Sequence, residues 1–223
     1  MVKQQKVLLY GGAFNPPHLG HKAVAEAALE HMSKFGYEQL WFVPSAMDMF
    51  GKKTLVSPEH RFGMLVLMTS TDMGRRFSVE MSDIKLENNK GTYALLCHMR
   101  KIYPTYEFAF VIGSDQALKI KKWRNYERLL EKIPLVIVER WTGLLTKDIK
   151  STVDDLFKNA DYYFVPYQDV AQKLGDLAFK DISSTKIKKD LLNCQHLLST
   201  VVSYYINLYN LYQRQNNVRI IRR

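Results

Sequence analysis

The chain has 223 residues, of which 47% are hydrophobic and 24% are charged, an ordinary globular composition that excludes a disordered or fibrous protein. Its two cysteines, Cys97 and Cys194, form no CxxC pair, which excludes a disulfide scaffold or a cysteine-rich zinc site and is typical of a reducing compartment. The formal net charge of +10 suits phosphorylated ligands and nucleic acid equally well.

In chain order, the apolar pattern alternates between strands and helices. Short apolar runs bounded by turn residues predict strands at 6–10, 39–43, 107–112, 135–139 and 162–165. Helical spacing and strong helix formers predict helices from residue 20 onward, at 58–73, at 125–132 and near 151–158. This alternation predicts an α/β fold, a Rossmann-like doubly wound parallel sheet with helices on both faces.

The length favours a single domain. We expect it to span residues 1–212, with a small helical part at about 183–212, followed by a flexible basic tail at 213–223. The apolar run near the N-terminus is too short for a signal peptide or a membrane span, so we expect a cytoplasmic protein that does not contact a membrane. A homo-oligomer is compatible with the sequence.

The first segment with unusual chemistry is GGAFNPPHLGH at 11–21, between the first predicted strand and the first helix. Gly11 and Gly12 allow a sharp turn and a close approach to a ligand, and the following helix points free N–H groups at anions. His18 and His21 are three residues apart, so in a first helical turn both could donate hydrogen bonds to phosphate oxygens. The alternatives are a structural turn with two surface histidines, or a metal pair that lacks an obvious third ligand.

The second segment is DISSTKIKK at 181–189, before a helical pattern. Serine or threonine caps a helix here, and hydroxyls, free N–H groups and lysines at one helix start would form a cradle for a pyrophosphate. The alternative is an ordinary capped basic helix facing solvent.

The third segment combines IGSD at 112–115, Trp123 and a predicted strand that ends near Arg140. It lies where open parallel sheets bind their ligands, at the carboxyl ends of strands. Taken alone, Asp115 is more often a helix N-cap and Trp123 more often a core anchor.

The string GGxFxPxHxGH after an N-terminal strand resembles the signature of the nucleotidyltransferase superfamily that contains the nicotinate and nicotinamide mononucleotide adenylyltransferases. That family also carries ISSTxIR near its C-terminus, where Lys188 here stands in the arginine position and keeps the charge without the bidentate fork. Softer matches are KGTY at 90–93, the loop at 44–61, which is similar to eukaryotic-type members, and the closing helix to Tyr212. The resemblance covers nearly the whole chain.

This resemblance implies a role for each matching residue. It implies catalytic roles for His18, His21 and Lys188. It implies binding of ATP and its phosphates by Gly11, Gly12, Ala13, Phe14, Gly20, Gly113, Asp115, Ile182, Ser183, Ser184 and Thr185. It implies binding of the mononucleotide by Lys53, Thr92, Tyr93, Trp123 and Arg140. In this scheme Asp115 accepts hydrogen bonds from the adenosine ribose and Trp123 stacks on the pyridine ring.

The implied reaction joins ATP and nicotinate or nicotinamide mononucleotide, with pyrophosphate as the leaving group, in NAD biosynthesis. Mg²⁺ would travel with ATP, and we expect no metal site made of protein ligands alone, because the sequence offers no dense carboxylate cluster. The sequence does not distinguish the two mononucleotides.

Two other functions remain open at this stage. One is another member of the superfamily, such as a phosphopantetheine adenylyltransferase or a cytidylyltransferase, against which Trp123 and the chain length argue. The other is a non-enzymatic nucleic-acid-binding protein, but the basic residues are dispersed and no binding module is recognised, so we expect no nucleic-acid partner.

Overall fold

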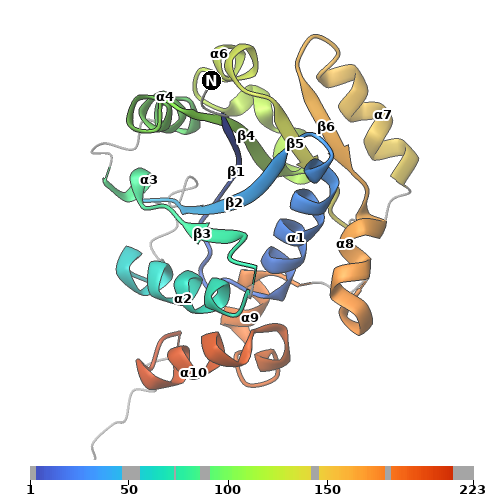
Figure 1. Cartoon of the computed structure of the whole chain (residues 1–223). Coiled ribbons are helices and arrows are strands. Elements are labelled where there is room, and N and C mark those ends of the chain that lie inside the picture. Colours follow the sequence, from blue (N-terminus) through green and yellow to red (C-terminus); the bar gives the residue numbers. More distant parts are fainter. Residues whose placement is uncertain are drawn as a thin grey trace, which may run out of the picture.

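The computed structural model describes residues 4–46, 56–72, 74–85, 91–141, 146–178 and 182–212. Within these residues, six parallel strands form one sheet of order β3-β2-β1-β4-β5-β6 (Figure 1). The strands are β1 (Gln5–Gly12), β2 (Tyr37–Pro44), β3 (Phe77–Val79), β4 (Tyr106–Gly113), β5 (Leu135–Val138) and β6 (Tyr162–Val165). The predicted doubly wound α/β fold is confirmed.

Helices and short helical turns connect the strands. They are α1 (Leu19–Ser33), α2 (Pro58–Ser70), α3 (Ser82–Lys85), α4 (Thr92–Ile102), α5 (Ser114–Ala117), η1 (Ile120–Lys122), α6 (Tyr126–Lys132), α7 (Thr146–Leu156), α8 (Tyr167–Leu174), η2 (Gly175–Leu177), α9 (Ser184–Lys189), η3 (Gln195–Leu197) and α10 (Thr200–Leu208). No helix within the described ranges is both long enough and apolar enough to cross a membrane.

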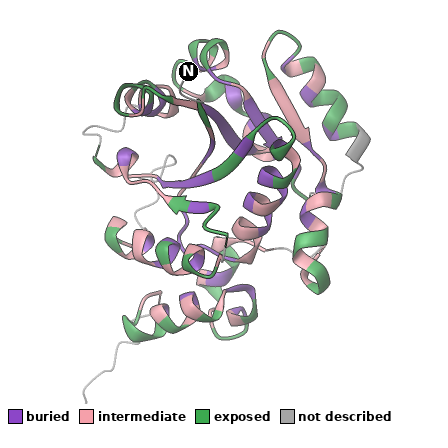
Figure 2. Ribbon diagram, viewed as in Figure 1, coloured by how far each residue is buried: buried purple, intermediate pink, exposed green. Residues whose placement is uncertain are grey.

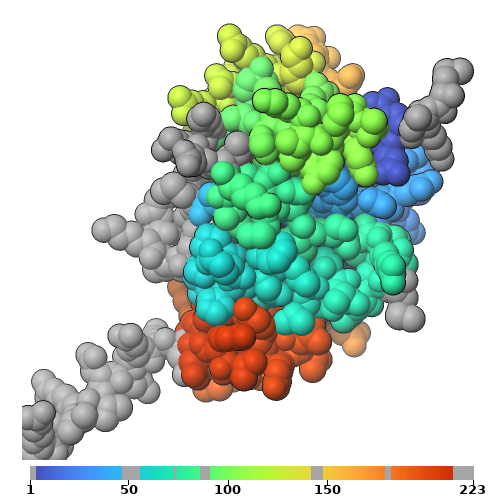
Figure 3. All heavy atoms as spheres, turned by 60° about the vertical axis from the view of Figure 1, so that its left-hand side comes forward, coloured from blue at the N-terminus to red at the C-terminus, as the bar shows by residue number. Residues whose placement is uncertain are grey.

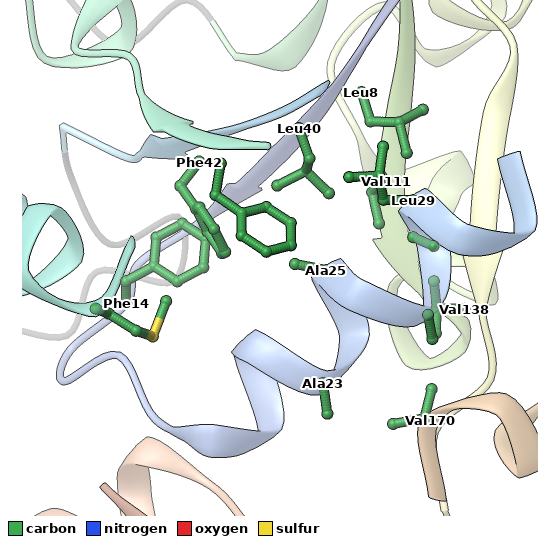
Figure 4. Close-up of a cluster of buried hydrophobic side chains, with 14 of the residues drawn as sticks. Leu8, Phe14, Ala23, Ala25, Leu29, Leu40, Phe42, Val111, Val138 and Val170 are labelled. Carbon is green, nitrogen blue, oxygen red and sulfur yellow. The ribbon is translucent and has the colours of Figure 1, made fainter. Parts of the chain in front are cut away.

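Strand periodicity divides the core into two apolar clusters, one on each face of the sheet. Leu8 of β1 packs with α1, α2, α8 and the C-terminal helices, whereas its neighbours Val7 and Leu9 pack with α4, α6 and α7. Figure 2 shows the resulting buried sheet between more exposed helices, and Figure 4 shows Ala23 and Ala25 of α1 in the first cluster. Alanines on this face let α1 lie close to the sheet.

Several boundaries differ from those expected. β1 continues through Gly11 and Gly12, which were expected to form the turn, because both still pair with β2. The helix expected at 58–73 ends at Ser70. The three-residue edge strand β3 and the eight-residue α8 were not expected, since such short segments carry too little periodicity to be recognised. The predicted tail at 213–223 lies outside the described residues.

The chain leaves the sheet in opposite directions from β1 and β4, which are neighbours, so their carboxyl ends form the topological switch point. The C-terminal helical part completes the first cluster, to which Ile187, Leu197, Val202 and Ile206 contribute. Figure 3 shows α10 packed directly against α2, at the edge of the molecule. The hydroxyl of Tyr212, the last described residue, donates to Asn15 in the β1–α1 connection.

Candidate functional site

A cavity of about 490 Å³ opens at the switch point, a volume in the usual range for small-molecule sites. The ends of β1, β2, β4 and β5 and the beginnings of α1, α4 and α9 contribute to its wall. It brings together most of the residues singled out from the sequence, namely Gly11, Gly12, Ala13, His18, Gly20, His21, Thr92, Gly113, Asp115, Trp123, Arg140, Ile182, Ser183, Ser184, Thr185 and Lys188.

The two histidines cap α1 reciprocally. His18 is the N-cap residue, and its Nδ1 accepts a hydrogen bond from the His21 backbone N–H at 3.3 Å, while His21 Nδ1 accepts one from the His18 N–H at 3.2 Å. The two rings stack with their centroids 3.7 Å apart. Because each Nδ1 is an acceptor, the single proton of each neutral imidazole is on Nε2. His18 therefore precedes the helix, whereas both had been expected inside the first turn.

Both imidazoles are neutral at physiological pH. Burial lowers the pKa of His18 well below its usual 6.5, and His21 and Arg140 lower it further. Burial also lowers the pKa of His21 to about 3, with a contribution from the nearby positive charge of Arg140. Desolvation dominates in each case, because an imidazolium would lose its water here without an anion beside it. The pair offers two N–H donors and no net charge.

The two sequence motifs meet in space. Ser184 Oγ of α9 donates a hydrogen bond to the carbonyl oxygen of Pro16 at 2.8 Å, across 168 positions of the chain. Ser183 is the N-cap of α9, as expected for a serine here, and accepts from the Lys186 N–H at 3.3 Å. Lys188 lies at the same cavity wall. The expected phosphate cradle (hereafter the cradle) would thus be formed by both motifs together. Residues 11–17, named the phosphate loop after the role expected from the sequence, lie on one side and α9 on the other.

Acidic and basic side chains meet beyond β4 and β5. Asp115 Oδ2 lies 3.4 Å from Arg140 Nη1, and Gln116 Nε2 donates to the same oxygen at 3.0 Å. The Arg140 backbone N–H donates to Ser114 Oγ at 3.0 Å, which ties the two strand ends together. The side chains of Asp115 and Arg140 are 31% and 49% exposed, so both remain accessible to a ligand. Asp115 is not an N-cap, because Gly113 occupies that position of α5.

Trp123 lies between the core and the cavity. Its ring is edge-on to that of Phe110, with the ring centroids 6.4 Å apart, and the residue also lines the cavity wall. It therefore anchors the second cluster and still presents indole surface to a ligand. Thr92 also reaches the wall, at the start of α4, but Gly91 with φ of 80° is the N-cap there.

Among the described residues, two predicted binding residues, Phe14 and Tyr93, do not line the wall. Phe14 belongs to the phosphate loop, has φ of 46° and is buried, and its ring centroid lies 4.9 Å from that of His21, so its side chain packs against the histidine. Tyr93 packs against the second apolar cluster instead. Lys53 lies outside the described residues.

Other polar groups of the cavity were not expected from the sequence. Glu139 is 3% exposed and its Oε2 accepts from the Tyr167 backbone N–H at 2.8 Å. Asp83 Oδ2 accepts from the Ala46 N–H at 2.9 Å, and burial raises the pKa of this carboxyl. Glu139 is the last residue of a predicted strand and could have been recognised by that position. Asp83 follows the short β3, which gave no comparable signal.

The groups around the cradle are suited to anions. Across the described parts of the chain, no group of three or more His, Cys, Asp or Glu side chains could hold a metal ion. Imidazole N–H groups, hydroxyls and a lysine are donors that complement phosphate oxygens. Such a donor set fits a polyphosphate that brings its own cation.

Known proteins resemble this chain over most of its length. The family model for cytidylyltransferase-like proteins matches residues 9–190. A probable nicotinate-nucleotide adenylyltransferase of Flavobacterium johnsoniae is 30% identical over 216 residues, covering 94% of this chain and 100% of the relative. Another of Bacillus cereus is 27% identical over 210 residues, covering 94% and 99%.

Solved structures show the same fold. The nicotinic acid mononucleotide adenylyltransferase of Plasmodium falciparum, complexed with APC, superposes with a TM-score of 0.70 at 23% identity, covering 93% of this chain and 97% of that one. The same enzyme complexed with NaAD gives a TM-score of 0.69 at 24% identity, with the same coverage.

Proposed function

The chain belongs to the cytidylyltransferase-like family and, within it, to the nicotinate-nucleotide adenylyltransferases, and from this we propose that it transfers AMP from ATP to nicotinate mononucleotide. The products are the dinucleotide deamido-NAD and pyrophosphate, a step of NAD biosynthesis. The 5′-phosphate of the mononucleotide attacks the α-phosphorus of ATP, forming a P–O bond as the bond to pyrophosphate breaks. This phosphate is already ionised, so no protein nucleophile is required.

The cradle performs the transfer by holding the two anions in line. His18 and His21 donate from Nε2 to the phosphates of ATP, and Lys188 neutralises charge that builds on the leaving pyrophosphate. Ser183, Ser184 and the other residues of the α9 start bind the β- and γ-phosphates. Because both imidazoles are neutral, their contribution is oriented hydrogen bonding rather than proton transfer.

The two nucleosides occupy the two sides of the switch point. Asp115 accepts hydrogen bonds from the adenosine ribose, and Arg140, whose Nη1 lies 3.4 Å from Asp115 Oδ2, contacts the mononucleotide. Trp123 stacks on the pyridine ring, and Thr92, which also lines the cavity, is a mononucleotide contact. We place Lys53 in the mononucleotide site from the sequence alone.

Mg²⁺ accompanies ATP in this scheme. Carried by the phosphates of ATP, it would supply charge neutralisation during transfer. Asp115 is already paired with Arg140, and this pairing favours hydrogen bonding of Asp115 to the ribose hydroxyls over binding of the cation. The protein groups of the cradle therefore hold the phosphates and leave the cation to them.

One observation carries this proposal, the hydrogen bond from Ser184 Oγ to the Pro16 carbonyl. Two motifs that resemble the halves of a single triphosphate site would mean little on opposite sides of the molecule. Their direct contact at one cavity supports a shared ligand. We further propose that residues 1–212 act as one nucleotidyltransferase domain, since the C-terminal helices contribute to the first cluster.

The test is a comparison of kcat/KM for nicotinate mononucleotide, nicotinamide mononucleotide and 4′-phosphopantetheine, each with Mg-ATP. We expect dinucleotide and pyrophosphate with nicotinate mononucleotide at the highest kcat/KM, and no transfer to 4′-phosphopantetheine. Transfer to 4′-phosphopantetheine alone, or no pyrophosphate with any acceptor, would contradict the proposal. A preference for nicotinamide mononucleotide would change the acceptor and leave the reaction class intact.

A substitution at His18 separates its two functions. An asparagine at this position would still cap α1, because asparagine is a preferred N-cap residue, but it would remove the Nε2–H donor. We therefore expect His18→Asn to melt within a few degrees of the wild type and to lose about tenfold to a hundredfold in kcat, the scale of one oriented donor. His21→Ala should show the same kcat loss. Near wild-type turnover in both variants would refute the assignment.

A further inference from the structure

Buried side chains that have no role in the scheme above hold the phosphate loop from behind. Arg61 of α2 is fully buried, and it donates to the Ala13 carbonyl from Nη1 at 2.9 Å and to the Val56 carbonyl from Nε at 3.0 Å. Asn15 is 2% exposed, and its Oδ1 accepts from the Val56 N–H at 3.3 Å and from the Tyr212 hydroxyl at 2.7 Å. The loop is therefore tied both to the start of α2 and to the end of the described chain.

Tyr212 reaches Asn15 across 197 positions of the sequence. The chain turns after α10, where the Leu211 N–H donates to the Ile206 carbonyl at 2.9 Å and Tyr212 adopts a left-handed φ of 61°. Its ring packs against the first apolar cluster, and burial raises the pKa of its hydroxyl, which remains a donor throughout the physiological range. A tyrosine that only packed on the surface at the end of α10 would need neither the turn after this helix nor a buried hydrogen-bond acceptor such as Asn15.

The bond acts on the part of the loop where displacement matters most. Asn15 precedes Pro16, whose carbonyl receives the Ser184 hydroxyl, and His18 follows three positions after Asn15. Both lone pairs of Asn15 Oδ1 are used, one toward Val56 and one toward Tyr212. Because transfer depends on the alignment of reacting atoms to within about 1 Å, a loop that is free to shift at Asn15 would misplace the imidazole donors.

We propose that Tyr212 is a positioning residue of the adenylyl transfer, holding the phosphate loop in its reactive arrangement through Asn15. The inference rests on the proposed function but adds to it a contribution from the C-terminal end of the domain. Tyr212 does not touch the substrates, since it is absent from the residues that line the cavity. Its effect passes through the hydrogen bond to Asn15.

The experiment compares two chemically identical changes on the C-terminal segment. Tyr212→Phe removes the hydroxyl that reaches Asn15 and keeps the packed ring. Tyr204→Phe removes the hydroxyl of a tyrosine of α10 that is 68% exposed, and serves as the matched control. For Tyr212→Phe we expect kcat/KM for ATP to fall about tenfold, with KM for nicotinate mononucleotide changed less than about twofold. Tyr204→Phe should match the wild type in both.

Two further measurements separate positioning from simple destabilisation. Amide hydrogen exchange across residues 11–21 should become faster in Tyr212→Phe and stay unchanged in Tyr204→Phe, at a temperature well below unfolding of each variant. In Asn15→Leu, adding Tyr212→Phe should cost almost nothing more in kcat/KM, because the bond is already absent. An active wild type with Tyr212→Phe equal to Tyr204→Phe overturns this inference alone. A wild type that forms no dinucleotide overturns the proposed function and this inference with it.

Discussion

At the scale of single residues, the reciprocal capping of His18 and His21 determines what the pair can offer a ligand. Each Nδ1 is committed to the backbone N–H of the other residue, so each ring keeps one donor, Nε2–H. The two donors are oriented before ATP arrives, which avoids the cost of ordering them during transfer. Because each ring is held by the backbone N–H of the other residue, replacing one side chain leaves the hydrogen bond that orients the other ring and removes only the stacking between them.

The depressed pKa values of these histidines predict acid sensitivity of the unliganded protein. In the unfolded chain each imidazole takes up a proton below pH of about 6.5. In the folded state His21 stays neutral down to a pKa of about 3, and the pKa of His18 is also lowered well below its usual value. The free energy of unfolding is therefore independent of these groups above a pH of about 6.5 and falls as the pH decreases below it, by at most about 1.4 kcal/mol per pH unit for each histidine.

Urea unfolding at pH 7.5, 6.5, 5.5 and 5.0 measures this slope. Carboxylates also contribute to acid sensitivity, since hydrogen bonds and ion pairs lower the pKa of Asp72 and Asp154 in the folded state. The double variant His18→Asn, His21→Gln retains those carboxylates and serves as the control. We expect the wild type to lose more stability than this variant between pH 6.5 and 5.0. Parallel curves for the two proteins would contradict neutral, desolvated imidazoles.

At the scale of elements, the change from glycine to alanine should have different effects at two strand ends, one on ATP binding and one on stability. A Cβ on Gly113 would lie 2.6 Å from Asp115 Oδ1, the end of a side chain that can swing aside. A Cβ on Gly11 would lie 2.7 Å from Phe110 Cζ, a ring packed in the second cluster. Gly113 has φ of −74°, which alanine adopts without strain. We expect Gly113→Ala to displace the carboxylate and raise KM for ATP about tenfold, the value of a hydrogen bond to a charged group.

Gly11→Ala should mainly lower stability, by about 1–3 kcal/mol, because the phenyl ring has little room to move. For both variants, KM for ATP is measured from initial rates and stability from urea unfolding, and each is compared with the wild type. A Gly113→Ala enzyme with unchanged KM for ATP would show that Asp115 does not bind the ribose.

Long elements and local motifs were predictable from the sequence, whereas contacts between distant segments were not. Buried strands such as β5 and β6 carry enough consecutive apolar residues to be found within one residue of their bounds. The cradle residues of α9 were identified by the resemblance and by the types of their side chains. Asn15 and Tyr212 each lie in a segment that matched the family, but nothing in the sequence indicated the hydrogen bond between them, which forms only in the folded chain. Phe14 is buried and packs on His21, and its expected contact with ATP stays a prediction, because a buried support and a binding residue look alike within a motif.

At the scale of the whole molecule, residues from both apolar clusters line the cavity. Val138 in its wall is part of the first apolar cluster, and Leu95, Phe110 and Ile112 are part of the second. The phosphate loop is held from α2, from α9 and from the end of the chain, as described above. A ligand that fills the cavity therefore contacts segments from nearly the full length of the domain, and its binding energy stabilises all of them against unfolding.

This arrangement predicts one cooperative thermal transition that ligands shift as a whole. ATP at one hundred times its Kd should stabilise the fold by about 2.7 kcal/mol, which for a chain of this size corresponds to a rise in Tm of about 5–10 °C. Nicotinate mononucleotide at the same multiple of its Kd should give a comparable rise, while 4′-phosphopantetheine and duplex DNA at physiological salt should give none. Calorimetry with each ligand measures the shift. A second transition that ATP leaves unmoved would mean that part of the domain folds independently of the site. A rise in Tm with DNA alone would favour a nucleic-acid-binding protein over the enzyme, because a ligand raises Tm only if it binds the folded state.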